Sequence, residues 1–220
     1  MLFLFEFNHH PHWMMVAKLY TLDASPPNRA CMIACELFKV PVEFVEVNVL
    51  EDEHLKPEFL KTTVSETQRY LHYINFHAIL MYVADVYGKQ DSFYPKEPRQ
   101  RALVNQKLFF VATILFARLR SITGSKEISQ KNLNAIEEAY GFLEEFLSRA
   151  KYLAGNNITI ADIAAYPTIS SLLFLLELNA QKYPKTQAWV KEMEKLPYVQ
   201  RNNAKGNETL KELFNKKLNS

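Results

Sequence analysis

Glycine is scarce in this sequence, with only five glycines among 220 residues. A β protein rich in tight turns needs more, because turns with positive φ favour this residue. The chain also lacks a G-x-G-x-x-G or Walker pattern, which argues against a glycine-rich loop that binds phosphate groups. The apolar fraction of 48% suffices for a large core, and the length fits one large or two small domains.

Cysteine is also rare. Cys31 and Cys35 are the two cysteines, and they lie four residues apart on an expected helix. This spacing is neither C-x-x-C nor a disulfide framework. It favours a reducing compartment and two small core residues.

Charge of one sign and long apolar runs are missing as well. The net charge is +2 and no basic tract is present, so nothing supports a nucleic-acid partner. No stretch approaches the ~20 apolar residues of a membrane span, so we expect no membrane partner either.

Residues 1–17 are predicted to form a disordered extension. Residues 1–7, MLFLFEF, are apolar but short and contain Glu6, which makes a poor signal peptide. Three histidines that could bind a metal follow: His9, His10 and His12. No carboxylate or cysteine accompanies them in a fixed element, so we predict no metal site. The natural start could also be a later methionine, Met14 or Met15.

The most informative stretch is KLYTLDASPPNR, residues 18–29. Residues 17–22 predict a strand, and Pro26 and Pro27 open a helix that extends to Lys39. Ser25 stands at the N-cap of that helix, so its hydroxyl lies at the positive end of the helix dipole. A serine at this position can simply cap the helix, or it can also stabilise a bound thiolate.

The second interpretation is energetically reasonable. A thiol with a pKa near ~8.5 is only a few per cent ionised at neutral pH. A hydrogen bond to a charged group contributes roughly 1.5–3 kcal/mol, and one pKa unit corresponds to about 1.36 kcal/mol. One hydroxyl could therefore make the thiolate a major species.

The first half of the chain predicts an α/β fold. Residues 42–49 are rich in β-branched residues and form a second strand after the helix. Strand, helix and strand with tight joins give a βαβ unit, in which the strands are parallel. Residues 62–76 suit either a helix or a strand, and residues 77–87 form a helix that Gly88 ends. Residues 89–98 are polar, contain two prolines and predict an interdomain linker.

The second half predicts only helices. Apolar residues recur with helical spacing throughout this part of the chain. The expected helices are 99–122, 130–149, 160–176, 186–195 and 208–218. Thr159 and Asp162 form a variant capping box for the third of these, which is apolar nearly all round and should be central.

Six stretches occur in this order along the chain: LYTLDASPPNRA, HLKPEFLK, HAILMYVADVYGK, LFARLR, LAGNNITIADI and AWVKEMEKLPY. In these stretches the sequence resembles the cytosolic glutathione transferases, most closely the insect delta and epsilon classes. It implies a thioredoxin-like α/β domain, residues 18–88, and an all-helical domain, residues 99–220. It also implies a cytoplasmic homodimer that uses glutathione as co-substrate and hydrophobic electrophiles as substrates.

The resemblance also implies roles for single residues. Ser25 would stabilise the thiolate of glutathione, and His54 would hold the glycine end of the tripeptide. The hydrophobic pocket for the electrophile would be bordered by Leu22, Ala24, Phe110 and Arg118. Without the family, Phe110 would be interpreted as a core residue and Arg118 as a surface charge.

One segment departs from the family pattern. Between Pro57 and Pro95 there is no proline, whereas the family has a cis-proline there that lets the backbone pair with glutathione. Asn75 and Phe76 stand where the family has a Glu-Ser pair that binds the γ-glutamyl end. The segment is also shorter than in the family, so part of the last β-hairpin could be missing.

Two functions from different classes follow. The first is an enzyme that conjugates the glutathione thiolate to hydrophobic electrophiles and so detoxifies them. The second is a catalytically impaired protein of this family that binds ligands. The unusual segment at 62–76 could also come from an aberrant transcript.

Overall fold

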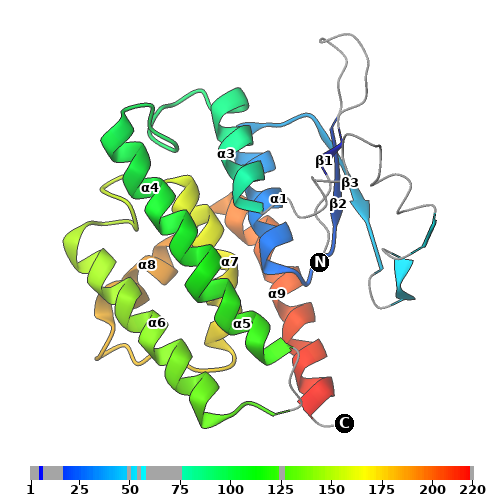
Figure 1. Cartoon of the computed structure of the whole chain (residues 1–220), viewed down its shortest axis with the longest axis vertical. Helices are drawn as coiled ribbons and strands as arrows, with labels where there is room; N and C mark the ends of the chain where they lie inside the picture. Colours follow the sequence, from blue (N-terminus) through cyan, green and yellow to red (C-terminus); the bar gives the residue numbers. More distant parts are fainter. Residues whose placement is uncertain are drawn as a thin grey trace.

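The protein is described by a computed structural model that covers residues 5–6, 17–48, 51–53, 56–57, 76–123 and 127–218. A small sheet lies on one side of a larger helical body (Figure 1). The helix α1 (Pro26–Phe38) stands between the sheet and the rest of the helices.

The βαβ unit predicted from the sequence is confirmed. β2 (Ala17–Thr21) pairs in parallel with β3 (Val42–Glu46), with Leu19 opposite Phe44, and α1 forms the crossover. Both strands end earlier than expected, at Thr21 instead of 22 and at Glu46 instead of 49.

A short strand precedes this unit. β1 (Phe5–Glu6) pairs antiparallel with β2, with Phe5 opposite Leu19, so β2 is the central strand of the described sheet. At Phe5, Glu6 and Ala17 the structure therefore differs from the disordered extension expected for residues 1–17. The physical reason is that an edge strand presents unpaired N–H and C=O groups, which a neighbouring strand can satisfy. The three histidines of that extension lie outside the described residues.

The remaining described elements are helices. They are α3 (Phe76–Tyr87), α4 (Pro98–Phe110), η3 (Val111–Leu115), α5 (Phe116–Thr123), α6 (Gln130–Arg149), α7 (Ile160–Leu173), α8 (Pro184–Glu194) and α9 (Pro197–Leu218). The segments α4, η3 and α5 form one continuous helix, in which η3 is a π-helical turn. The expected helix 208–218 was too short, because α9 already begins at Pro197. Its first half contains Asn and Gly residues of low helix propensity, and packing against α1 overrides that propensity.

α7 is the central helix of the helical body, as its sequence predicted. Nearly every side chain of α7 is buried. Its N-terminus is fixed by the predicted capping box, in which the Thr159 amide and hydroxyl donate to Asp162 Oδ2 over 2.9 and 3.1 Å. Asp162 Oδ1 also accepts from the Leu153 amide and from Trp189 Nε1, both over 3.0 Å.

A single hydrophobic cluster joins the two halves of the chain. It includes Leu19 of the sheet, much of α1 and the apolar residues of α7. Cys31 and Cys35 are both buried and unpaired, which confirms their place in the core. The predicted linker joins α3 to α4, and its Tyr94 is buried and donates to Asn105 Oδ1 over 3.0 Å. The domain boundaries themselves stay a prediction.

One helix bears on the expectation that no stretch approaches the length of a membrane span. Among the described residues, the continuous helix from Pro98 to Thr123 is long and apolar enough to cross a membrane, by length and composition alone. A core helix can meet the same criterion. Leu108, Leu115 and Leu119 of this helix belong to the hydrophobic cluster.

Candidate active site

The turn between β2 and α1 carries Ser25. The Ser25 amide donates to Leu22 O over 2.8 Å and closes the turn, and the Arg29 amide donates to Ser25 O over 3.0 Å as the helix starts. Ser25 has extended backbone angles and Pro26 follows as the first helical residue. The predicted N-cap is therefore confirmed, for the predicted reason: proline costs no hydrogen bond at this position.

The positive end of the α1 dipole favours an anion beside Ser25. The first turn of α1 contains no acidic residue, so no neighbouring carboxylate in that turn offsets the positive end of the helix dipole. The Ser25 hydroxyl accepts from the Asn28 amide over 3.5 Å, which is long for a hydrogen bond. Its O–H can donate to a bound anion. The Ser25 side chain is 2% exposed.

The structure places the other predicted site residues in three groups. Leu22 and Ala24 share the turn with Ser25. Phe110 instead packs edge-on against two phenylalanines of α6, Phe142 and Phe146, with ring centroids 6.0 and 5.1 Å apart. Arg118 also faces α6, where it forms an ion pair with Glu138.

Three residues stand at the positions predicted to bind the γ-glutamyl and glycine ends of glutathione, and two of them, His54 and Asn75, lie outside the described residues. Phe76 begins α3 and is buried, with its ring centroid 6.3 Å from that of Phe116 on α5. The ambiguous segment 62–76 is otherwise outside the described part of the chain.

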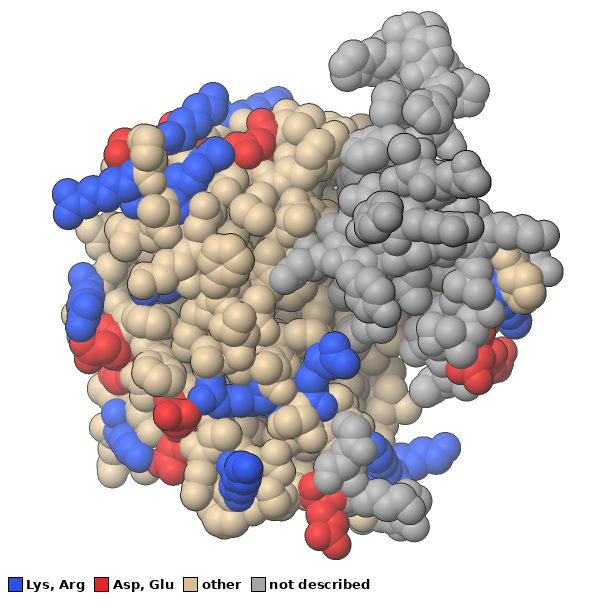
Figure 2. All heavy atoms as spheres, viewed as in Figure 1, with Lys and Arg blue, Asp and Glu red and all other residues tan. Residues whose placement is uncertain are grey.

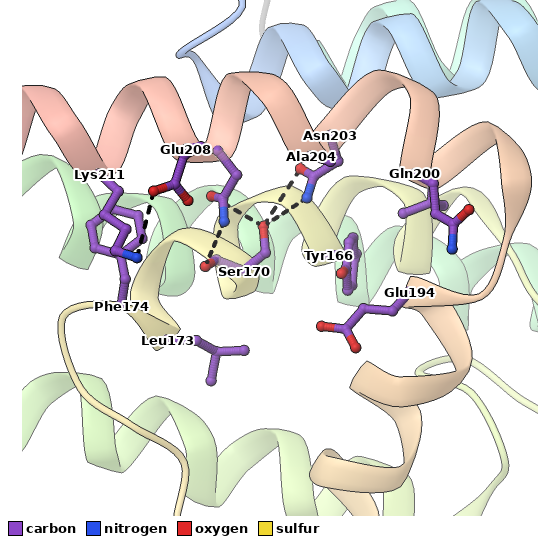
Figure 3. Close-up of a pocket in the computed structure, with 12 residues that line it drawn as sticks. Tyr166, Ser170, Leu173, Phe174, Glu194, Gln200, Asn203, Ala204, Glu208 and Lys211 are labelled. Carbon is purple, nitrogen blue, oxygen red and sulfur yellow. Dashed lines mark hydrogen bonds and ion pairs between the residues drawn. The ribbon is translucent and has the colours of Figure 1, made fainter.

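Four hollows in the described part lie away from Ser25, which lines none of these four. One of about 400 Å³ lies between α7 and α9 and is lined by Tyr166, Ser170, Asn203 and other residues (Figure 3). A second, of about 170 Å³ and mostly apolar, lies between α3 and α4. Among the described residues, no group of three or more His, Cys, Asp or Glu could hold a metal ion.

A buried polar network that the sequence analysis did not predict lies behind the turn. Arg29, on the first turn of α1, is 0% exposed. Its Nη1 donates to Asn203 Oδ1 over 2.6 Å and to Asn207 Oδ1 over 3.1 Å, both on α9. Its Nη2 donates to Ser171 Oγ on α7 over 2.7 Å. Burial lowers the pKa of Arg29 from 12.5 to about 9, so the guanidinium stays charged at neutral pH.

Gly206 permits the close approach of α9 to this turn. A Cβ at position 206 would lie 2.1 Å from the carbonyl oxygen of Asp23 and 2.9 Å from Cδ of Arg29. Only glycine fits at such a contact. One signal could have found this network: a charged residue, Arg29, sits next to the apolar positions of an amphipathic helix.

Comparisons with known proteins agree with this geometry. Residues 86–197 match the sequence model described as "Glutathione S-transferase, C-terminal domain". Glutathione S-transferase 1 of Manduca sexta is 37% identical over 217 residues, which cover 93% of this chain and all of that relative.

Solved structures of similar proteins share the fold. An epsilon-class glutathione S-transferase of the housefly, Musca domestica, superposes with a TM-score of 0.84 at 36% identity, over 91% of this chain and 97% of that one. A glutathione transferase homologue from Drosophila mojavensis with bound glutathione superposes with a TM-score of 0.82 at 35% identity, over 91% and 96% of the two chains.

Proposed function

The chain belongs to the glutathione transferase family, with a thioredoxin-like N-terminal domain and a helical C-terminal domain, and we propose that it conjugates glutathione to small hydrophobic electrophiles. Ser25 is the residue that we propose to activate the thiol. The observation that carries this role is the position of Ser25 at the N-cap of α1, directly after β2, with no acidic residue in the first turn of the helix.

The proposed chemistry has two steps. In the first, the thiol of glutathione loses its proton to solvent, and the sulfur anion accepts a hydrogen bond from the Ser25 hydroxyl at the positive end of α1. A charged hydrogen bond of roughly 1.5–3 kcal/mol lowers the thiol pKa by about one to two units. In the second, the sulfur attacks an electrophilic carbon. With a chloroarene, the C–S bond forms and chloride leaves.

The residues proposed for the electrophile pocket differ in where they lie relative to Ser25. Leu22 and Ala24 lie in the turn that carries Ser25, so they can border a ligand held there. Phe110 and Arg118 enter the proposal only through the family resemblance, because their described contacts are with α6. His54 also enters only through the resemblance.

A homodimer is the assembly that we propose. Four large apolar side chains are exposed on α3 and α4: Tyr82, Val86, Leu103 and Phe109. Phe109 is 66% exposed, and it borders the apolar hollow between these helices. Figure 2 shows an uncharged area over α3 and the adjoining part of α4, with charged side chains above and below it. Large exposed apolar patches of this kind mark interaction sites.

The cytoplasm is the proposed location, and detoxification the proposed role. The two thiols of α1 are buried and unpaired, which suits a reducing compartment. The detoxifying role follows from the proposed substrates, since conjugation makes an apolar electrophile polar and unreactive.

The test of the catalytic role is Ser25→Ala, with Ser129→Ala as matched control. Ser129 is the N-cap of α6, so both changes remove an N-cap hydroxyl, which typically costs ~1 kcal/mol of stability. Conjugation of a chlorodinitrobenzene at neutral pH should fall about ten- to a hundredfold in Ser25→Ala only. Equal turnover in the two variants would remove Ser25 from the mechanism. A wild-type protein that binds hydrophobic ligands without turnover would contradict the enzymatic function.

A further inference from the structure

Arg29 is a fully buried cation whose described hydrogen bonds all go to uncharged groups. Its guanidinium donates to two side-chain amide oxygens, to the backbone oxygen of Asn203 over 3.5 Å and to the Ser171 hydroxyl. Burial of a charge is costly unless hydrogen bonds satisfy it, so each of these acceptors matters. The arrangement ties the first turn of α1 to both α7 and α9.

The acceptors are themselves held in orientation. Asn203 Nδ2 donates to Ser170 Oγ over 3.1 Å, and Asn207 Nδ2 donates to Ser170 O over 3.2 Å. Figure 3 shows Asn203 and Ser170 hydrogen-bonded to each other where they line the hollow between α7 and α9. Because the N–H groups of both amides are bound on the Ser170 side, their oxygens face Arg29. The planar guanidinium of arginine, with its N–H donors in a fixed fork, matches this set of oxygens, whereas the ammonium group of lysine does not.

The same residue is connected directly to the candidate site. The Arg29 amide donates to Ser25 O, so the backbone of Arg29 closes the turn in which Ser25 is the N-cap. On the other side, Gly206 of α9 lies against the carbonyl of Asp23, two residues before Ser25. The Ser25 backbone is thus held from one side by the Arg29 amide, and the turn before it is in contact with α9 at Gly206.

We propose that Arg29 is a positioning residue for the thiol-activating serine: it anchors the first turn of α1 to α7 and α9 and so fixes the direction of the Ser25 hydroxyl. This inference rests on the proposed function. The inference goes beyond the proposed function because it assigns part of the thiol activation to a residue that does not touch glutathione. A hydroxyl that turns away from the sulfur no longer lowers the thiol pKa, even though it is still present.

The experiment compares Arg29→Met and Arg29→Lys with Arg201→Met. Arg201 is the matched control, because it also joins α1 to α9, through an ion pair with Glu36, but is mostly exposed. The main readout is the apparent pKa of the glutathione thiol, from the pH profile of kcat/KM and from the ultraviolet absorbance of the bound thiolate. A second readout is hydrogen exchange at the backbone amides of residues 25, 28 and 29 in the protein without ligand, since Pro26 and Pro27 have no amide hydrogen.

We expect the thiol pKa to rise by about one unit in Arg29→Met, which is a tenfold loss of thiolate below that pKa. Arg29→Lys should recover only part of the loss, and Arg201→Met should leave the pKa unchanged. Amide exchange at residues 25, 28 and 29 should accelerate in Arg29→Met only. If Arg29→Met does not fold, Asn207→Ala removes one acceptor without changing α1, and the same shift should appear at smaller size.

Two results would overturn the inference. One is an unchanged thiol pKa in a folded Arg29→Met or Asn207→Ala variant, which would leave Arg29 with a structural role alone. The other is unchanged amide exchange at residues 25, 28 and 29. A failure of the proposed function looks different: the wild-type protein would then show no thiolate with glutathione, while hydrogen exchange would still report whether Arg29 anchors the turn.

Discussion

Acid should destabilise this protein through one buried histidine. His77, the second residue of α3, is 4% exposed, and burial lowers its pKa from 6.5 to about 3. The unfolded chain therefore binds a proton below pH 6.5 that the folded chain binds only near pH 3. The stability contributed by neutral His77 is complete above pH 6.5 and is lost as the pH falls towards 3.

The size of the effect follows from this difference. Each pH unit below 6.5 costs about 1.36 kcal/mol, so at pH 5 the loss is about 2 kcal/mol. The perturbation is His77→Leu, which removes the titrating group and keeps an apolar side chain. Between pH 7.5 and pH 5, the wild-type free energy of unfolding should fall about 2 kcal/mol further than that of the variant.

The assay is urea unfolding of both proteins at the two pH values and at one protein concentration, because subunit association would also change the apparent stability. Any packing defect of His77→Leu appears equally at both pH values and cancels in the comparison. Identical pH dependence of the two proteins would refute the reasoning, since it would mean that His77 is protonated normally in the fold.

Three further changes test other parts of the structure. Asp162→Ala should leave buried donors such as Trp189 Nε1 unsatisfied and cost about 3 kcal/mol, or roughly 6–12 °C in Tm, while an unchanged Tm in calorimetry would contradict the capping role. Phe109→Glu should convert the proposed dimer to a monomer in sedimentation equilibrium, and a persisting dimer would place the interface elsewhere. Deletion of residues 1–16 should remove the antiparallel neighbour of β2 and accelerate amide exchange at Leu19, whereas unchanged exchange would mean that β1 adds no protection.

Local signals in the sequence predicted much of the fold. The start of α1 followed from Ser25 and two prolines, and the full length of α6 followed from its apolar spacing. These elements were predictable because caps and helical periodicity lie within one stretch of chain. The start of α9 was missed, since its first half is stabilised by contacts with α1 rather than by its own residues.

The candidate site was only half predictable, for the same reason. Ser25 and its cap could be found from neighbouring residues. The partners of Arg29 could not, because Ser171 lies 142 positions and Asn207 lies 178 positions further along the chain. Which polar groups meet there depends on how α7 and α9 are placed, and a single sequence does not encode that placement in any local pattern.

The π-helical turn η3 determines how the side chains of α5 are rotated about the helix axis relative to those of α4. In a regular α-helix each residue advances by about 100°, so Phe110 and Arg118 would point about 80° apart. The turn at Val111–Leu115 takes up one extra residue and reduces that angle to about 20°, which agrees with both side chains meeting α6. Removing a single residue from that turn would rotate every side chain of α5 about the helix axis by more than a quarter of a revolution. The length of the continuous helix would hardly change.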